Sequence, residues 1–238
     1  MPATQWPHET SESGPHAALA AALDAASEDV KALGKLKTTL FEAAPGDCDG
    51  DLLLFSATSA SRVRCGSPAP ATAAAFAPFL RRLLSPDVEP LLPTKGGAAM
   101  AHLFVCAHSK RDKRCGACGP ALLPLLKQAG GGSVVVRACS HIGGHAYAGN
   151  VLAFTRGADA AAPPTAPVRG DWYGYVTPDA VPRLVADVVA GRRGEARLFR
   201  GAMGMSKEEA VAAAAQAAET EAAAVAAGAP AAGTCTTC

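Results

Sequence analysis

Short apolar runs alternate with polar, glycine-rich segments through the second half of the chain, a pattern typical of α/β proteins. Strands are predicted over 101–106, 133–137, 151–154 and 171–176, and helices over 118–128 and 178–190. The first half shows a weaker pattern of the same kind, with helices predicted over 17–33 and 71–84 and strands over 36–41 and 51–55. The pattern therefore predicts an α/β fold throughout.

The predicted elements of the second half follow the order strand, helix, strand, loop, strand, strand, helix. This is the order of a thioredoxin-like domain whose middle helix is replaced by a glycine-rich loop. Gly50-Asp-Leu-Leu-Leu-Phe55 also resembles Gly149-Asn-Val-Leu-Ala-Phe154, about 99 positions later. We therefore expect a thioredoxin-like domain preceded by a degenerate thioredoxin-like half that lacks the candidate ligands.

Four regions are expected along the chain. Residues 1–16 are polar and predict a loose N-terminus, and residues 17–99 hold the degenerate half and a linker that begins near Pro86. Residues 100–204 form the thioredoxin-like domain. Residues 205–238 form an Ala-rich helical tail, which ends with the pair Cys235 and Cys238.

Charge and hydropathy exclude several classes of protein. The 22 Lys and Arg against 21 Asp and Glu give a net charge of +1, so we expect no binding of nucleic acid through bulk basicity. No run of eighteen apolar residues predicts a membrane span, and the first twenty residues lack the order of a signal peptide. We expect an intracellular, soluble protein and favour the cytoplasm, with an organelle left open. Eight cysteines in such a compartment favour metal, cluster or redox chemistry over structural disulfides.

Two ligand pairs follow predicted strands. Cys106 and Cys115 are separated by eight residues, and His141 and His145 by three; each pair lies in a polar loop containing glycine. In an open α/β sheet, such loops lie at the edge where ligands bind. Two thiolates and two imidazoles suit a tetrahedral Zn²⁺ or a [2Fe–2S] cluster, and the spacing does not choose between them.

A second motif overlaps the first pair. Cys115-Gly-Ala-Cys118 is a Cys-x-x-Cys at a predicted helix start, where the helix dipole lowers a thiol pKa and favours disulfide exchange. A thiol–disulfide oxidoreductase is therefore the alternative function, although it leaves Cys106, His141 and His145 unexplained. Cys139 is interpreted as a buried thiol rather than a further ligand.

Three blocks of the second half together resemble the sucrase/ferredoxin-like family, also called thioredoxin-like ferredoxins. They run from His102 to Pro120, from Cys139 to Leu152 and from Trp172 to Pro182. The resemblance implies a [2Fe–2S] cluster held by Cys106, Cys115, His141 and His145. It also implies an electron-transfer protein with a pH-dependent potential, a redox carrier rather than an enzyme with catalytic residues of its own. A structural zinc site stays a further alternative.

The loop between the two cysteines carries a basic rim, made of Lys110, Arg111, Lys113 and Arg114. This rim could steer an acidic electron donor such as a flavoprotein or ferredoxin reductase. Farther along the chain, Tyr173 and Tyr175 are expected on the same face of the predicted strand 171–176.

Overall fold

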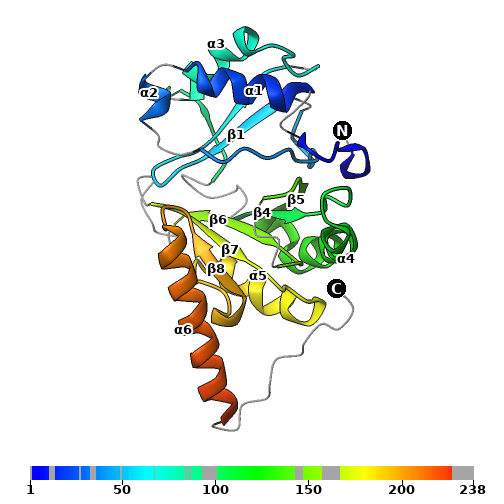
Figure 1. Ribbon diagram of the computed structural model, residues 1–238, viewed down its shortest axis with the longest axis vertical. Coiled ribbons are helices and arrows are strands. Elements are labelled where there is room, and N and C mark those ends of the chain that lie inside the picture. Colours follow the sequence, from blue (N-terminus) through cyan, green and yellow to red (C-terminus); the bar gives the residue numbers. More distant parts are fainter. Residues whose placement is uncertain are drawn as a thin grey trace.

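The protein is a mixed α/β molecule with two sheets, the smaller one built from the first half of the chain and the larger one from the second (Figure 1). The computed structural model describes residues 2–226 except 11–13, 27, 33–35, 49, 67, 84, 86, 93–100, 143–146 and 157–166. The two sheets and their helices confirm the coarse prediction of an α/β fold.

The larger sheet has five strands in the order β5-β4-β6-β7-β8. They are β4 (Ala101–Cys106), β5 (Val134–Cys139), β6 (Val151–Arg156), β7 (Val168–Tyr173) and β8 (Phe199–Ala202). β4 and β5 are parallel, and the other neighbouring pairs are antiparallel. Because parallel strands need a crossover, the helix α4 (Lys113–Gly130) connects β4 to β5.

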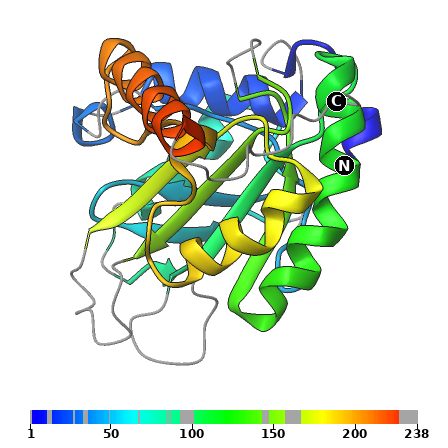
Figure 2. The ribbon, with the colours of Figure 1, turned by 90° about the horizontal axis from the view of Figure 1, so that it is seen from below.

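Both faces of the larger sheet are covered, which explains why every residue of β4 is buried. α4 and α5 (Val181–Val189) lie across one face (Figure 2), where Leu103 and Val105 join their core. The other face turns Phe104 and Cys106 toward the first half of the chain. On this side Phe55 stacks on Phe154 with ring centroids 4.0 Å apart.

The smaller sheet is antiparallel, in the order β1-β2-β3. Its strands are β1 (Asp51–Phe55), β2 (Ala60–Arg64) and β3 (Glu89–Pro90), and its helices are α1 (Gly14–Asp24), α2 (Glu28–Lys31) and α3 (Ala73–Leu83). The strand expected at 36–41 does not join this sheet; Phe41 instead bridges Cys139 of β5. Among the described residues of the first half, no strand pair is parallel as β4 and β5 are, so the expected second copy of that unit is not found.

Several predicted boundaries change. The helix expected over 17–33 divides into α1 and α2, and the strand expected over 171–176 ends at Tyr173. Short 3-10 turns occupy Ala3–Gln5, Gly131–Ser133, Pro178–Ala180 and Ala196–Leu198. The N-terminus expected to be loose contains Trp6, which is buried. In the expected linker, Leu91 and Leu92 are buried as well.

The Ala-rich tail forms α6 (Lys207–Ala226), as predicted. α6 packs at its start against β8, where Gly201 faces Ala210, and then projects beyond the sheet (Figure 1). Cys235 and Cys238 lie outside the described residues. None of the helices in the described part of the chain combines the length and apolar character that a membrane crossing requires.

A buried ion pair joins the two halves. Asp47 precedes β1, and its two carboxylate oxygens accept hydrogen bonds from Nε and Nη2 of Arg137 on β5, at 2.6 and 2.7 Å. Arg62 of β2 adds a contact of 2.6 Å to Asp47. Burial alone would raise the pKa of Asp47, but the hydrogen bonds and the positive charges of these two arginines outweigh it and lower that pKa.

Candidate metal centre

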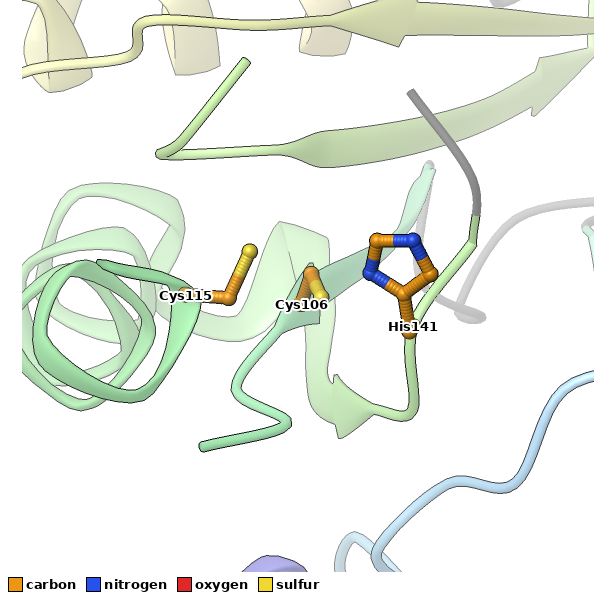
Figure 3. Close-up of side chains that lie close together, drawn as sticks. All are labelled: Cys106, Cys115 and His141. Atoms are coloured by element: carbon orange, nitrogen blue, oxygen red, sulfur yellow. The ribbon is translucent and has the colours of Figure 1, made fainter. Parts of the chain in front are cut away.

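Three of the predicted ligands lie together at one edge of the larger sheet. Cys106 is the last residue of β4, Cys115 lies in the first turn of α4, and His141 follows the end of β5 by two residues. Their ligand atoms all lie within 4.8 Å of one another, and Figure 3 shows the three side chains gathered from these separate segments. His145, the fourth predicted ligand, lies outside the described residues.

The fold brings Cys106 and Cys115 together through the start of α4. Asp112 caps this helix, and its carboxylate accepts a hydrogen bond from the Arg114 backbone N–H at 2.9 Å. Gly119, one turn further, lets the helix approach β4: a Cβ at this position would lie 2.4 Å from the Cys106 carbonyl oxygen. The missing side chain therefore allows α4 to hold Cys115 beside Cys106.

The two thiols are buried side by side. Cys106 and Cys115 are both 0% exposed. A hydrogen bond with the Cys106 thiol, burial, and the proximity of Cys106 raise the pKa of Cys115 far above its ordinary value. Two adjacent thiolates are therefore unfavourable here unless a cation lies between them. The amide Nδ2 of Asn150 lies 4.0 Å from the Cys115 sulfur and donates to the Tyr147 carbonyl at 2.7 Å.

A segment of the first half is hydrogen-bonded to the residues that flank His141. The Ser140 backbone N–H donates to the Leu40 carbonyl at 2.7 Å, and the Ser140 hydroxyl lies 2.7 Å from that of Thr39. Lys37 donates to the carbonyl of Ile142 at 3.3 Å. Residues 37–40 therefore fix the backbone on both sides of His141.

The geometry disfavours disulfide exchange at Cys115 and Cys118. Both residues are buried, and the pKa of Cys115 is raised, whereas an exchanging thiol needs access and a lowered pKa. The dipole effect expected at the helix start is outweighed by burial and by the neighbouring thiol. Cys139 is fully buried and bridges Phe41, and it is not in the group of close ligand atoms.

The basic rim is partly neutralised. Arg111 pairs with Glu9, and Arg114 pairs with Asp112 at 2.9 Å. Two of the four charges counted from the sequence are therefore compensated within the chain, which weakens the expected steering of an acidic donor.

Sequence reasoning missed residues that support the centre. Asn150 and Gly119 contact or approach the cysteines, and Asp112 sets the helix start, but none of them belongs to a ligand motif. Two local signals were the Gly149-Asn150 pair, since an Asn in a tight turn often has a side-chain role, and Asp112, since Asp is favoured at the start of a helix. Asn150 is fully buried, and its Oδ1 accepts a hydrogen bond from Trp172 Nε1 at 3.2 Å.

Comparisons with curated proteins give relatives from yeasts. "Altered inheritance of mitochondria protein 32" of Debaryomyces hansenii is 39% identical over 102 residues, which cover 42% of this chain and 34% of the relative. The protein of the same name from Clavispora lusitaniae is 33% identical over 140 residues, covering 56% of this chain and 48% of the relative. "Actin patches distal protein 1" of Saccharomyces cerevisiae is 31% identical over 118 residues, 42% of this chain and 34% of the relative. The chain thus matches about a third to a half of each relative's length.

These names correct the predicted function. They refer to the inheritance of mitochondria and to actin patches, and none describes an iron–sulfur electron carrier. The expectation of an electron-transfer ferredoxin is therefore wrong, and so is the description of the chain as an electron-transfer and redox protein, which followed from it. It rested on carrying a family's role over from ligand motifs, and such motifs specify a binding site rather than its use.

The family itself is shown by a match along most of the chain. No solved structure matches. A model of the sucrase/ferredoxin-like family matches residues 1–201, which include the first half as well as the three blocks of the second. The chain therefore belongs to the sucrase/ferredoxin-like family.

Proposed function

We propose that this chain binds a metal centre through Cys106, Cys115 and His141. The observation that carries the proposal is the convergence of two thiols and one imidazole, with all ligand atoms within 4.8 Å of one another. Two thiolates on one tetrahedral zinc would lie about 3.8 Å apart, given zinc–sulfur bonds of about 2.3 Å. The spacing of the three groups suits shared coordination without large rearrangement.

The electrostatics of the site support this proposal. The raised pKa of Cys115 reflects the hydrogen bond with the Cys106 thiol, burial, and the charges of Cys106 and Asp112 nearby. A metal cation supplies a compensating positive charge, because coordination deprotonates thiols and stabilises the thiolates. The same arrangement gives a thiol–disulfide enzyme no accessible nucleophile.

We assign the domain that carries the site to the thioredoxin-like folds. The strand order β5-β4-β6-β7, the single parallel pair, the crossover α4 and the final helix α5 support this assignment. The connection from β5 to β6 contains His141 and His145 where other such domains have a helix. In this arrangement the ligands occupy the carboxyl edge of the parallel strands.

The cofactor we propose is a [2Fe–2S] cluster, with His145 as the fourth ligand. The donor set of two cysteines and histidine is one that such clusters accept, and zinc is the competing occupant. When bound, the cluster would supply two iron atoms, which the thiolates and imidazoles of this chain would hold. The chain's own part is to bind and bury it, without catalytic residues, so we propose a binding protein rather than an enzyme.

Beyond correcting the electron-transfer role, the relatives' names bear only on location. Mitochondria and actin patches describe those proteins, not this chain. From them we carry over one point, that the compartment proposed for this chain extends from the cytoplasm to the mitochondrion.

The test is metal analysis of the chain purified without oxygen. Iron, acid-labile sulfide and zinc are measured per chain, together with the visible absorption spectrum. We expect two irons and two sulfides, and we expect Cys106→Ser or Cys115→Ser to lose most of the bound metal while circular dichroism stays unchanged.

Cys118→Ala is the matched control, because it removes a buried thiol of the same helix turn that is not in the ligand group. It should retain the metal. One zinc per chain and no visible colour would support the metal site and overturn the cluster. A wild-type chain without metal, or full loading of the Cys106→Ser/Cys115→Ser double variant, would overturn the proposal.

A further inference from the structure

The N-terminal segment Ala3–Glu9 docks beside the proposed metal centre. Trp6 is 1% exposed and packs against Ala107 and Ala138, which adjoin the ligand-bearing ends of β4 and β5. Its ring meets that of His108 edge to face, with centroids 5.7 Å apart. Glu9 pairs with Arg111 in the loop between the two cysteines. The segment is therefore anchored by an aromatic side chain and by an ion pair.

His108 touches both this segment and a proposed ligand. Its Nε2 lies 2.8 Å from the Pro7 carbonyl oxygen, and its Nδ1 lies 3.4 Å from the backbone nitrogen of His141. A carbonyl oxygen only accepts hydrogen bonds, so Nε2 carries the proton and Nδ1 is the acceptor for the His141 N–H. One buried imidazole thus joins the N-terminal segment to the backbone of His141.

We propose that His108 is a positioning residue that couples docking of residues 3–9 to the placement of His141. The inference rests on the proposed function in one respect, that His141 binds the metal. Undocking of the segment withdraws the Pro7 carbonyl and the Trp6 ring, the two groups that hold the imidazole in place. The His141 N–H then loses its oriented acceptor, and the backbone at His141 is no longer held by this hydrogen bond. The segment therefore acts as a strap that holds the metal in the site.

Two conservative variants separate the two hydrogen bonds. In His108→Asn the amide oxygen takes the place of Nδ1 and accepts from His141, but the side chain is too short to reach Pro7. In His108→Gln the amide nitrogen takes the place of Nε2 and donates to Pro7, but the acceptor for His141 is lost. Trp6→Ala removes the anchor of the segment without changing His108.

The measurement is the rate at which chain reconstituted with Zn²⁺ releases the metal to a chelator. Outer-shell changes commonly alter metal affinity 10- to 100-fold, so we expect Trp6→Ala to accelerate release about tenfold in the wild-type background. In the His108→Asn or His108→Gln background, Trp6→Ala should add less than twofold, because the coupling is already broken. Equal effects of Trp6→Ala in all three backgrounds would overturn the proposal.

Phe76→Ala is the control for general destabilisation. It removes another buried aromatic side chain, in the cluster between α1 and α3, and should leave zinc release unchanged. Acceleration by Phe76→Ala equal to that of Trp6→Ala would count against a specific role of the segment.

The amide exchange rate of His141 separates failure of this inference from failure of the proposed function. In the metal-free chain, Trp6→Ala should accelerate exchange of the His141 N–H at least tenfold, as measured by NMR, because its acceptor is no longer held. If the wild-type chain binds neither iron nor zinc, but Trp6→Ala still accelerates the exchange relative to the wild type, the metal site is refuted and the coupling stands. An unchanged exchange rate would refute the coupling.

Discussion

His102 is a buried histidine that its neighbours keep neutral. Its Nδ1 accepts a hydrogen bond from Arg137 at 2.8 Å, and its Nε2 lies 2.8 Å from the Leu91 carbonyl. Burial and the positive charge of Arg137 lower the pKa of His102 to about 4. The protonated imidazole would be repelled by the positive charges of both Arg137 and Arg62.

This arrangement makes stability depend on pH. Between about pH 6.5 and 4 the unfolded chain binds a proton at position 102 and the folded chain does not, so the free energy of unfolding decreases as pH falls through this window. The loss at the lower end is on the order of 3 kcal/mol. Urea denaturation at pH 7 and pH 4.5 should therefore show a smaller pH effect for His102→Gln than for the wild-type chain. His8→Gln, at an exposed position, is the control; equal pH effects in wild-type chain and His102→Gln would contradict the prediction.

Local chain geometry explains one residue that sequence reasoning misplaced. Tyr173 and Tyr175 were expected on the same face of a strand, but β7 ends at Tyr173, and Tyr175 has a φ of 59°. Tyr173 is therefore fully buried and Tyr175 is 49% exposed. No pattern of polar and apolar residues signals a left-handed tyrosine, because the turn is fixed by distant partners: the N–H groups of Tyr175 and Val176 donate to the carbonyls of Ala148 and Gly149, more than twenty positions earlier in the chain.

At the scale of elements, α5 shows how the covering helices stabilise the larger sheet. Leu184 is completely buried in the core under α5. Leu184→Ala should lower the free energy of unfolding by about 2–5 kcal/mol, because it removes apolar contacts and leaves a cavity. The control is Val211→Ala on α6, at a position that is 61% exposed, where the change should stay within about 0.5 kcal/mol. Equal losses at the two positions in urea denaturation would contradict this account.

Elements with a strong periodic pattern were predictable, and those shaped by distant partners were not. β4, β5 and α5 have the apolar runs or spacing that their covered faces require. β2 and β8 were missed because Ala60-Ser-Arg-Val-Arg64 and Phe199-Arg-Gly-Ala202 contain charged and small residues. Arg62 of β2 is largely buried through ion pairs with Asp47, Asp51 and Glu89, whereas Arg64 is exposed and pairs with Asp51; a local pattern does not reveal these pairs.

At the scale of the whole molecule, the Asp47–Arg137 pair makes the two halves depend on each other. Asp47→Asn should lower the free energy of unfolding by about 3–5 kcal/mol, because it leaves the buried guanidinium of Arg137 without its counter-charge. Thermal or urea unfolding measures the loss. Asp87→Asn, at an exposed position, should change it by less than about 0.5 kcal/mol.

The same pair adds an acid dependence. The pKa of Asp47 lies below its ordinary value of 3.8, so its contribution is complete above about pH 4 and is lost as the pH falls through the folded-state pKa. The wild-type chain should therefore lose stability below pH 4 more steeply than Asp47→Asn. Identical acid profiles would show that the pair contributes no net stability.

The site was predictable to the extent that its ligands follow strands. Cys106 ends β4 and His141 follows β5 by two residues, and the parallel pairing of these strands brings them together. The sequence did not predict the covering segments, since Trp6 and Thr39 reach the site from positions about 100 residues away along the chain. Contacts at such separations depend on how the two halves pack, which no local motif encodes.

Gly119 offers a marker for comparing this chain with others that carry two cysteines at the same spacing. An alanine there would have to push α4 away from the Cys106 carbonyl, and Cys115 would move with the helix. A chain with both cysteines but a larger residue four positions after the second would keep the motif and lose the closeness of the two sulfurs. This one alignment column would therefore separate chains in which the two sulfurs lie close together from chains that have both cysteines without that geometry.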